Sequence, residues 1–233
     1  MASLNAALAT LRRTRLRLAD LKGRLGTGFS LDELVPLQSH PKVQGRVRYK
    51  MSNPLDDIAA EVGAIVGQYR AVLDQVVHSL IELRSGAVPP QRSQFPICKT
   101  AKDFNLRAKL DLIGLLPSDA AMIEKLQPYN GVFWTRRIKE LAEEHKHRKL
   151  IDVKANGGAT FNGTPVTANF TAFSRLASGS LIPSAVAVRS EVRGPFTFKG
   201  DGSPVVETLE ALQANVLALV EELKPLFDAV EAW

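Results

Sequence analysis

The stretch from Pro54 to Leu83 most constrains what this chain can fold into. Its apolar residues recur in steps of three and four positions, the spacing of one face of an α-helix. A helix of about 30 residues is roughly 45 Å long, so its apolar face needs several neighbouring elements to cover it. The pattern therefore predicts a central scaffold helix whose inner face carries Leu55, Ile58, Val62, Ile65, Val66, Tyr69, Val72, Leu73, Val76, Val77, Leu80 and Leu83.

Similar spacing predicts helices before and after this scaffold. The N-terminal one has a leucine stripe and ends near Gly26 and Gly28, while its arginines lie largely off the stripe. A C-terminal helix is predicted over 203–231, with Pro225 kinking or breaking it near its end. Three shorter helices are predicted over 102–110, 117–126 and 132–150. The leucines of the N-terminal stripe are Leu4, Leu8, Leu11, Leu18, Leu21 and Leu25.

Two segments alternate with the period of two that is typical of β-strands. Residues 43–50 place Val43, Val47 and Tyr49 on one side and basic residues on the other, which predicts a strand with a basic outer face. Residues 151–199 are rich in glycine and β-formers, and Asn162-Gly163 is a signal for a two-residue hairpin turn. The segment 29–41 is interpreted as irregular, with room for a short helical turn.

These patterns predict an α+β chain that is predominantly helical. We expect a long-helix bundle with a small antiparallel β-hairpin or sheet as an appendage. One composite domain over 1–233 is predicted, because neither half presents a complete core alone. It comprises a mainly helical core over 1–150 with the strand at 43–50, a β-rich segment over 151–199, and a C-terminal helix over 203–231 that returns to the bundle.

Composition narrows the class of protein and of site. The single cysteine, Cys98, argues against a disulfide framework or a multi-cysteine zinc site and fits a reducing cytoplasm. No apolar run reaches the roughly 18–20 residues of a membrane span, and arginines interrupt the first 25 residues where a signal peptide would need an apolar core. We therefore expect a soluble cytoplasmic protein that binds no membrane, no metal and no cofactor.

The net charge of +6 is unevenly distributed along the chain. Residues 1–50 hold ten Lys or Arg against three Asp or Glu, a balance of +7, whereas residues 201–233 hold one against seven, a balance of −6. A basic surface of this kind favours contact with nucleic acid or with an acidic protein. Alternatively, the basic N-terminal helix packs beside the acidic C-terminal helix, or across a homodimer from it.

Two polar clusters are candidates for a functional site. Arg70, Asp74 and His78 are each four residues apart, so they share one face of the central helix, where they could bind a phosphate or move a proton, or simply form a surface ion-pair ladder. The second cluster ends the 132–150 helix and contains His145, Lys146, His147 and Arg148. These residues could form an anion site or only complement the helix dipole. No phosphate-binding loop, dinucleotide fingerprint, HExxH pair or nucleophile elbow is present.

Four short motifs resemble a family of uncharacterised bacterial, actinobacterial and phage proteins over about residues 43–150. In order, they are Arg70, Leu73 and Asp74; Phe95, Pro96 and Ile97; Gln127, Pro128 and Tyr129; and Lys146, His147 and Arg148. In that family the long helix typically reads Asn-Leu-Arg-Ser-Ala-Leu-Asp-His, and the later helix ends in Asp-Lys-His-Arg. The resemblance identifies relatives and implies no settled activity.

The Arg-x4-His spacing of those relatives is in turn distantly similar to HEPN-fold proteins, helical dimers that include metal-independent ribonucleases. This resemblance implies a site in which Arg70 and Arg148 hold the phosphate and His78 or His147 moves the proton. The chain departs from the pattern at Gln75, which stands where the histidine would fall and whose amide does not titrate. His145 likewise replaces the aspartate before Lys146.

The sequence thus leads to two hypotheses of different classes. The leading one is a non-enzymatic binding or assembly protein, dimeric through its long helices, whose basic surface contacts nucleic acid or an acidic partner. The alternative is a HEPN-like, metal-independent endoribonuclease that uses Arg70, Asp74, His78 and His147, with Arg148, Lys146 and His145 binding the substrate.

Overall fold

A computed structural model describes residues 3–27, 29–36, 38–39, 47–48, 54–146, 153–161, 164–166 and 185–231. The prediction of a mainly helical α+β chain is confirmed. The chain divides into two compact units, and each is described by itself. Unit 1 is Met1–Asp20, Glu61–Ile151 and Val206–Trp233, and unit 2 is Leu21–Ala60 and Asp152–Val205. The prediction of one composite domain stays a prediction.

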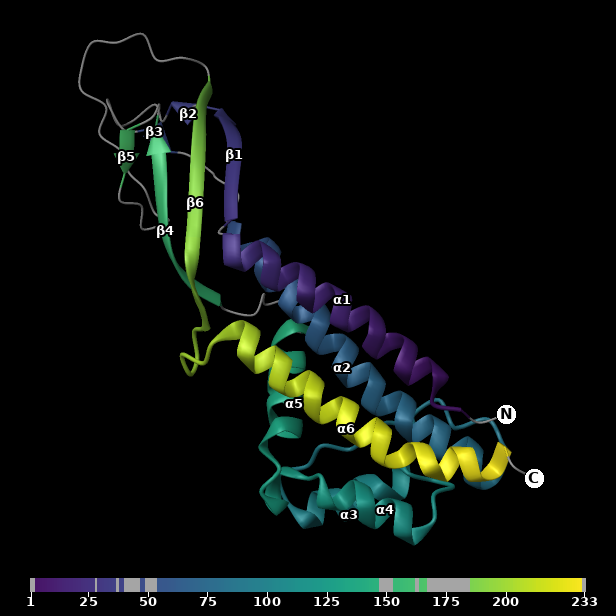
Figure 1. Cartoon of the computed structure of the whole chain (residues 1–233). Coiled ribbons are helices and arrows are strands. Elements are labelled where there is room, and N and C mark those ends of the chain that lie inside the picture. Colours follow the sequence, from purple (N-terminus) through teal and green to yellow (C-terminus); the bar gives the residue numbers. More distant parts are fainter. Residues whose placement is uncertain are drawn as a thin grey trace. The chain divides into compact units, whose positions relative to one another are not determined.

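Unit 1 is built on the predicted scaffold helix, α2 (Pro54–Ser85). Every position of its predicted inner face from Ile58 to Leu80 is buried, while Leu55 and Leu83 near its ends are half-buried. Figure 1 shows α1 (Asn5–Thr27) and α6 (Val205–Glu231) running beside it. The buried side chains of these three helices are mostly aliphatic, as expected for a chain with only 6% aromatic residues.

Hydrogen bonds fix how the long helices of unit 1 lie. The Thr14 hydroxyl donates to Gln68 Oε1 at 2.8 Å, and the Ser79 hydroxyl donates to Ser3 O at 2.9 Å. Ser3, just before α1, meets the later residue of α2, and Thr14 meets the earlier one, so these two helices are antiparallel. On the other side of α2, the buried Tyr69 hydroxyl donates to Leu209 O of α6 at 3.1 Å.

Pro225 was predicted to kink or break the C-terminal helix; α6 continues through it, so the break is wrong, while the kink stays a prediction. Proline removes one backbone hydrogen bond and crowds the preceding turn. Buried Leu223 and Phe227 on either side of Pro225 give this turn apolar contacts that offset the loss.

The remaining helices of unit 1 follow the predicted positions closely. They are α3 (Ala101–Asp111), α4 (Pro117–Lys125) and α5 (Phe133–Lys146), with a single 3₁₀ turn, η1 (Pro128–Asn130), before α5. Ile138 and Leu141 of α5 are buried, and Trp134 is half-buried. Residues 147–150 of the predicted 132–150 helix lie outside the described residues.

Unit 2 contains a four-stranded antiparallel sheet in the order β1-β6-β4-β5. Its strands are β1 (Phe29–Pro36), β4 (Val153–Phe161), β5 (Thr164–Val166) and β6 (Ala185–Phe198). β4 and β5 pair with Phe161 opposite Thr164. This is the register that the predicted hairpin requires, although residues 162–163 themselves lie outside the described residues.

The segments 29–41 and 43–50 of unit 2 differ from, or only partly test, what their sequences predict. The irregular assignment of 29–41 is wrong for Phe29–Pro36, which pairs along its whole length with β6, from Phe29 opposite Val192 to Pro36 opposite Ala185. The segment is a strand because it pairs with β6, which lies more than 140 residues later in the chain. The predicted strand at 43–50 is described only at β3 (Val47–Arg48), which pairs with β2 (Gln38–Ser39); the rest of it lies outside the described residues.

Candidate functional site

An extended segment, Ser93–Cys98, lies among the helices of unit 1 and contains the Phe-Pro-Ile motif. Its residues are buried except Gln94, which is half-buried, and none belongs to a helix or strand. A buried backbone needs hydrogen-bond partners for its N–H and C=O groups. Here side chains from α2, α5 and the turn after α4 supply them.

The ion pair of Arg70 and Asp74 holds Phe95. The Phe95 N–H donates to Asp74 Oδ1 at 2.8 Å, and Arg70 Nη2 donates to Phe95 O at 2.6 Å. The two side chains are themselves paired, with Arg70 Nη2 3.0 Å from Asp74 Oδ1. Together they do for Phe95 what a directly opposite residue does in an antiparallel sheet, where N–H and C=O of one residue are satisfied by one partner.

Gln127 holds the next part of the segment in a second sheet-like arrangement. Its Nε2 donates to Pro96 O at 2.8 Å, and its Oε1 accepts from the Cys98 N–H at 2.8 Å. In a parallel sheet, one residue likewise bonds to the two residues that flank its neighbour. The side chain is fully buried, and Nε2 also donates to Ile123 O one turn earlier at 3.1 Å.

Two further side chains hold the carbonyls of Ser93 and Ile97. His78 Nε2 lies 2.6 Å from Ser93 O, and because a carbonyl oxygen only accepts, Nε2 carries the proton of this bond. Lys139 Nζ of α5 donates to Ile97 O at 2.9 Å. The segment is therefore buried extended backbone whose hydrogen-bond partners are side chains, in place of a neighbouring strand.

The structure brings together three of the predicted catalytic residues, Arg70, Asp74 and His78, and gives them a structural task. All three bond to the backbone of residues 93–95. Burial lowers the pKa of Arg70, and the charges of Asp74, Asp111 and Glu143 oppose this effect. Two predicted residues, His147 and Arg148, lie outside the described residues, and the side chains of His145 and Lys146 do as well. The predicted meeting of the two clusters is therefore untested.

Sequence reasoning missed Gln127, Lys139 and Asp111 as site residues. Gln127 carried a usable signal, because it follows buried Ile123 by four positions and so continues the inner face of α4. Lys139 carried no such signal, because it directly follows buried Ile138 and so lies about 100° round α5 from it. Asp111 shows no such signal, since α3 exposes several leucines and its pattern does not identify an inner face.

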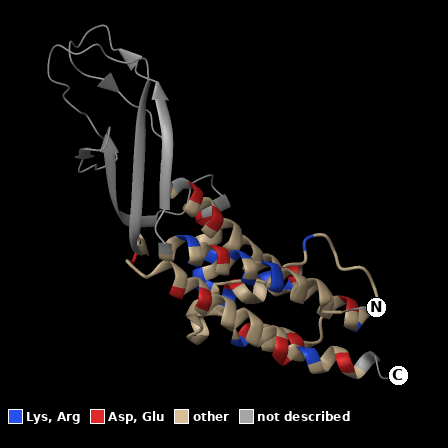
Figure 2. Cartoon of the chain, turned by 45° about the horizontal axis from the view of Figure 1, so that its top comes forward, with Lys and Arg blue, Asp and Glu red and all other residues tan. Residues whose placement is uncertain are grey.

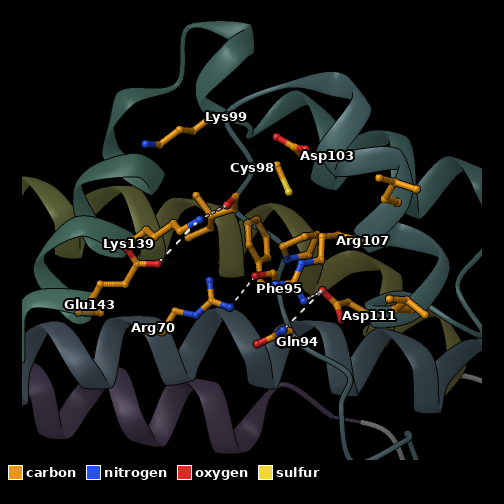
Figure 3. A pocket seen from close by; sticks show the side chains of 15 residues that line it. Arg70, Gln94, Phe95, Cys98, Lys99, Asp103, Arg107, Asp111, Lys139 and Glu143 are labelled. Carbon is orange, nitrogen blue, oxygen red and sulfur yellow. Dashed lines mark hydrogen bonds and ion pairs between the residues drawn. The ribbon is translucent and has the colours of Figure 1, made fainter. Parts of the chain in front are cut away.

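A cavity of about 550 Å³ opens beside the segment (Figure 3). Two of its charged wall residues are well buried: the side chain of Arg70 is 15% exposed and that of Asp111 is 4% exposed. Burial also raises the pKa of the Cys98 thiol in its wall. The lining residues are Arg70, Gln94, Phe95, Pro96, Ile97, Cys98, Lys99, Asp103, Leu106, Arg107, Leu110, Asp111, Lys139, Ala142 and Glu143.

A second feature is the basic face of α1, formed by Arg12, Arg13, Arg15 and Arg17. All four arginines are exposed, and Leu16 among them is 72% exposed. Arg17 Nε lies 3.5 Å from Glu61 Oε1 of α2. Within the described part of the chain, no ion pair engages the other three arginines. Among the described residues no ion pair joins this face to α6, and the alternative that the basic N-terminal helix packs beside the acidic C-terminal helix, or across a homodimer from it, stays a prediction.

The exposed carboxylates of α6 are Glu207, Glu210, Glu221, Glu222 and Asp228, and Figure 2 shows acidic residues recurring along this helix. Over the described ranges, no three His, Cys, Asp or Glu side chains gather in a way that could hold a metal ion.

Among the described helices, none is both long and apolar enough to cross a bilayer.

Comparison of the chain with protein-family models, with curated proteins and with solved structures yields no match.

Proposed function

We propose that this chain is a non-enzymatic binding or assembly protein that contacts nucleic acid or an acidic partner through the basic face of α1. The observation that carries the proposal is that the predicted catalytic residues are already hydrogen-bonded within the protein. Arg70, Asp74 and His78 are bonded to the protein's own backbone, at 2.6–2.8 Å. A histidine whose Nε2 proton is held by a carbonyl is poorly placed to exchange that proton with a substrate.

The basic face of α1 supports the binding part of the proposal. Three exposed arginines without an ion-pair partner in the described part of the chain keep their charge available for phosphates or carboxylates. Arginine forms paired hydrogen bonds to both groups. The assembly form of the proposal is a homodimer in which the basic face of α1 meets the acidic α6 of a second copy.

The test is fluorescence anisotropy with labelled single-stranded RNA over a range of salt concentrations. Binding should weaken as salt rises, because counterions are released when arginines neutralise phosphates. A variant with Arg12→Gln, Arg13→Gln, Arg15→Gln and Arg17→Gln should lose most of its affinity. For each phosphate contact removed, the slope of log K against log salt should fall by about 0.7.

A matched control removes the same charge elsewhere in unit 1. Arg92→Gln, Lys102→Gln, Lys109→Gln and Lys125→Gln change four exposed positions that lie outside the basic face. The control should bind nearly as tightly as the wild type. Equal losses in both variants would mean that only net charge matters and would contradict a specific surface. If RNA does not bind, light scattering at low and high salt tests the homodimer.

The ribonuclease alternative stays a prediction, because His147 and Arg148 lie outside the described residues. It requires wild-type protein to cleave mixed RNA in EDTA and His147→Ala to lose that cleavage. Intact RNA with the wild type would count against it. Arg70→Ala is a poor probe of catalysis here, since it also removes the bond to Phe95 O and disturbs the fold.

A further inference from the structure

The cavity beside the Phe-Pro-Ile segment has charged side chains of both signs on its wall. Four cations and three anions line it, so its formal charge is nearly balanced. A site with one sign of charge selects a simple anion or cation. A balanced site with separate buried charges instead matches a ligand that carries both signs itself.

The anionic side of the cavity is Asp111, whose carboxylate has only weak partners. Gln94 Nε2 lies 3.5 Å from Asp111 Oδ2, and Arg107 Nη1 lies 3.8 Å from the same oxygen. Both distances exceed those of a strong charge-assisted hydrogen bond. Asp111 also ends α3, where the helix dipole disfavours a negative charge. A buried carboxylate in this position would be stabilised by a cationic group placed in the cavity.

The cationic side of the cavity is Arg70. Its contacts to Phe95 O and Asp74 both use Nη2, which leaves the N–H donors of Nε and Nη1 without a hydrogen bond to a described residue. Figure 3 shows its guanidinium between Phe95 and Glu143, with Asp111 on the other side of Phe95. Lys139 adds a second positive charge on the Arg70 side of the wall.

Apolar side chains also line the cavity. Phe95, Ile97 and Cys98 form its buried part, while Leu106 and Leu110 of α3 remain 58% and 45% exposed. An apolar group in the cavity would cover these two leucines and remove their surface from water. The volume of about 550 Å³ lies within the usual range of small-molecule sites.

We infer that this cavity binds a small zwitterion of the class of free α-amino acids with an apolar side chain. The ammonium group lies against Asp111, the carboxylate accepts from Arg70, and the side chain packs on Leu106 and Leu110. This site is separate from the basic face of α1, and it stands or falls independently of the polyanion proposal.

Calorimetric titration of the full chain with three related probes tests the inference. Leucine carries both charges, leucinamide carries only the cation, and N-acetyl-leucine carries only the anion, at about pH 6.5 where the amine is protonated. Leucine should bind saturably at concentrations up to about 10 mM, which detects even a weak complex with a Kd of ~1 mM. Each singly charged analogue should bind about tenfold more weakly, because one charged hydrogen bond is lost.

Two variants and a control locate the site. Asp111→Asn removes the charge without changing shape, and Leu110→Trp fills the opening from a position that is already 45% exposed, so the fold should tolerate it. Both should weaken leucine binding at least about tenfold. Asp228→Asn, on the exposed surface of α6, should leave it unchanged.

Three results would overturn the inference: no saturable binding of leucine, equal affinity for leucine and its singly charged analogues, or wild-type affinity in both cavity variants. If Asp111→Asn does not fold, Leu110→Trp still decides whether the cavity is the site.

Discussion

Replacing Gln127 should reveal how much stability the buried segment draws from one side chain. Gln127→Ala leaves Pro96 O and the Cys98 N–H without partners in a buried region. An unsatisfied buried polar group costs about 1–3 kcal/mol, so the two together cost about 2–6 kcal/mol. We therefore expect a loss of about 4 kcal/mol, a large part of the ~5–15 kcal/mol that stabilises a typical domain.

A second substitution at this position, Gln127→Glu, adds a pH signature. The introduced carboxyl keeps an acceptor for the Cys98 N–H, but in its ionised form it places a negative oxygen against Pro96 O and Ile123 O. Burial and these carbonyls raise its folded-state pKa above the unfolded value of about 4.3. The stability contributed by the protonated form is thus complete below about pH 4 and is lost as pH rises. The deficit relative to wild type should be larger at pH 7 than at pH 4.

The measurement is urea unfolding followed by circular dichroism, with Gln75→Ala as the matched control. Gln75 on α2 is half-buried, but its Oε1 has no hydrogen-bond partner among the described residues. Removing it deletes the same atoms without breaking a hydrogen bond, so it should cost no more than about 1 kcal/mol. The reasoning fails if Gln127→Ala costs no more than Gln75→Ala, or if the Gln127→Glu deficit is the same at both pH values.

Three further predictions concern other parts of unit 1. Burial, and then the charge of Glu210, raises the pKa of Tyr69. The free energy of unfolding should therefore fall as pH rises above about 10, where the unfolded tyrosine ionises. In urea unfolding between about pH 9 and 11, the free energy of unfolding of Tyr69→Phe should fall less steeply than that of the wild type. Asp119 is 4% exposed and accepts from Arg84 Nε and Nη2 at 2.8 and 2.9 Å. Asp119→Asn should therefore lower the free energy of unfolding, measured by heat or urea, by about 2–3 kcal/mol. Asp57→Asn, at an exposed position, is its control. Pro225 is exposed inside α6, so Pro225→Ala should stabilise the chain by about 1–3 kcal/mol, and a decrease in melting temperature would contradict this expectation.

Sequence periodicity predicted the helices well because that information is local. The residues from Ile58 to Leu80 that repeat at helical spacing are the ones that the structure buries. The strand Phe29–Pro36 was missed because its alternation is broken at Asp32-Glu33, and its pairing partner β6 lies more than 140 residues later. Information on such a strand is carried by the pairing and is absent from the segment itself.

Sequence reasoning named three of the residues that hold the segment, but it did not predict their role and it missed Gln127 and Lys139. Helical spacing placed Arg70, Asp74 and His78 on one face of α2, and the structure agrees. Spacing could not show what faces them, because the segment 93–98 has no periodicity and reaches α2 only through the tertiary fold. A surface ion-pair ladder was the simplest alternative, yet Arg70 is too buried for that description.

The contacts also explain why three of the four motifs occur together. Arg70 and Asp74 bond to Phe95, and Gln127 bonds to the residues on either side of Ile97. A chain that buries an extended segment among helices needs a donor and an acceptor at each of these positions, and an ion pair and an amide supply both. We therefore predict that a chain carrying these three motifs holds its own Phe-Pro-Ile segment in the same way, through an ion pair at the phenylalanine and an amide at the two residues that flank the isoleucine.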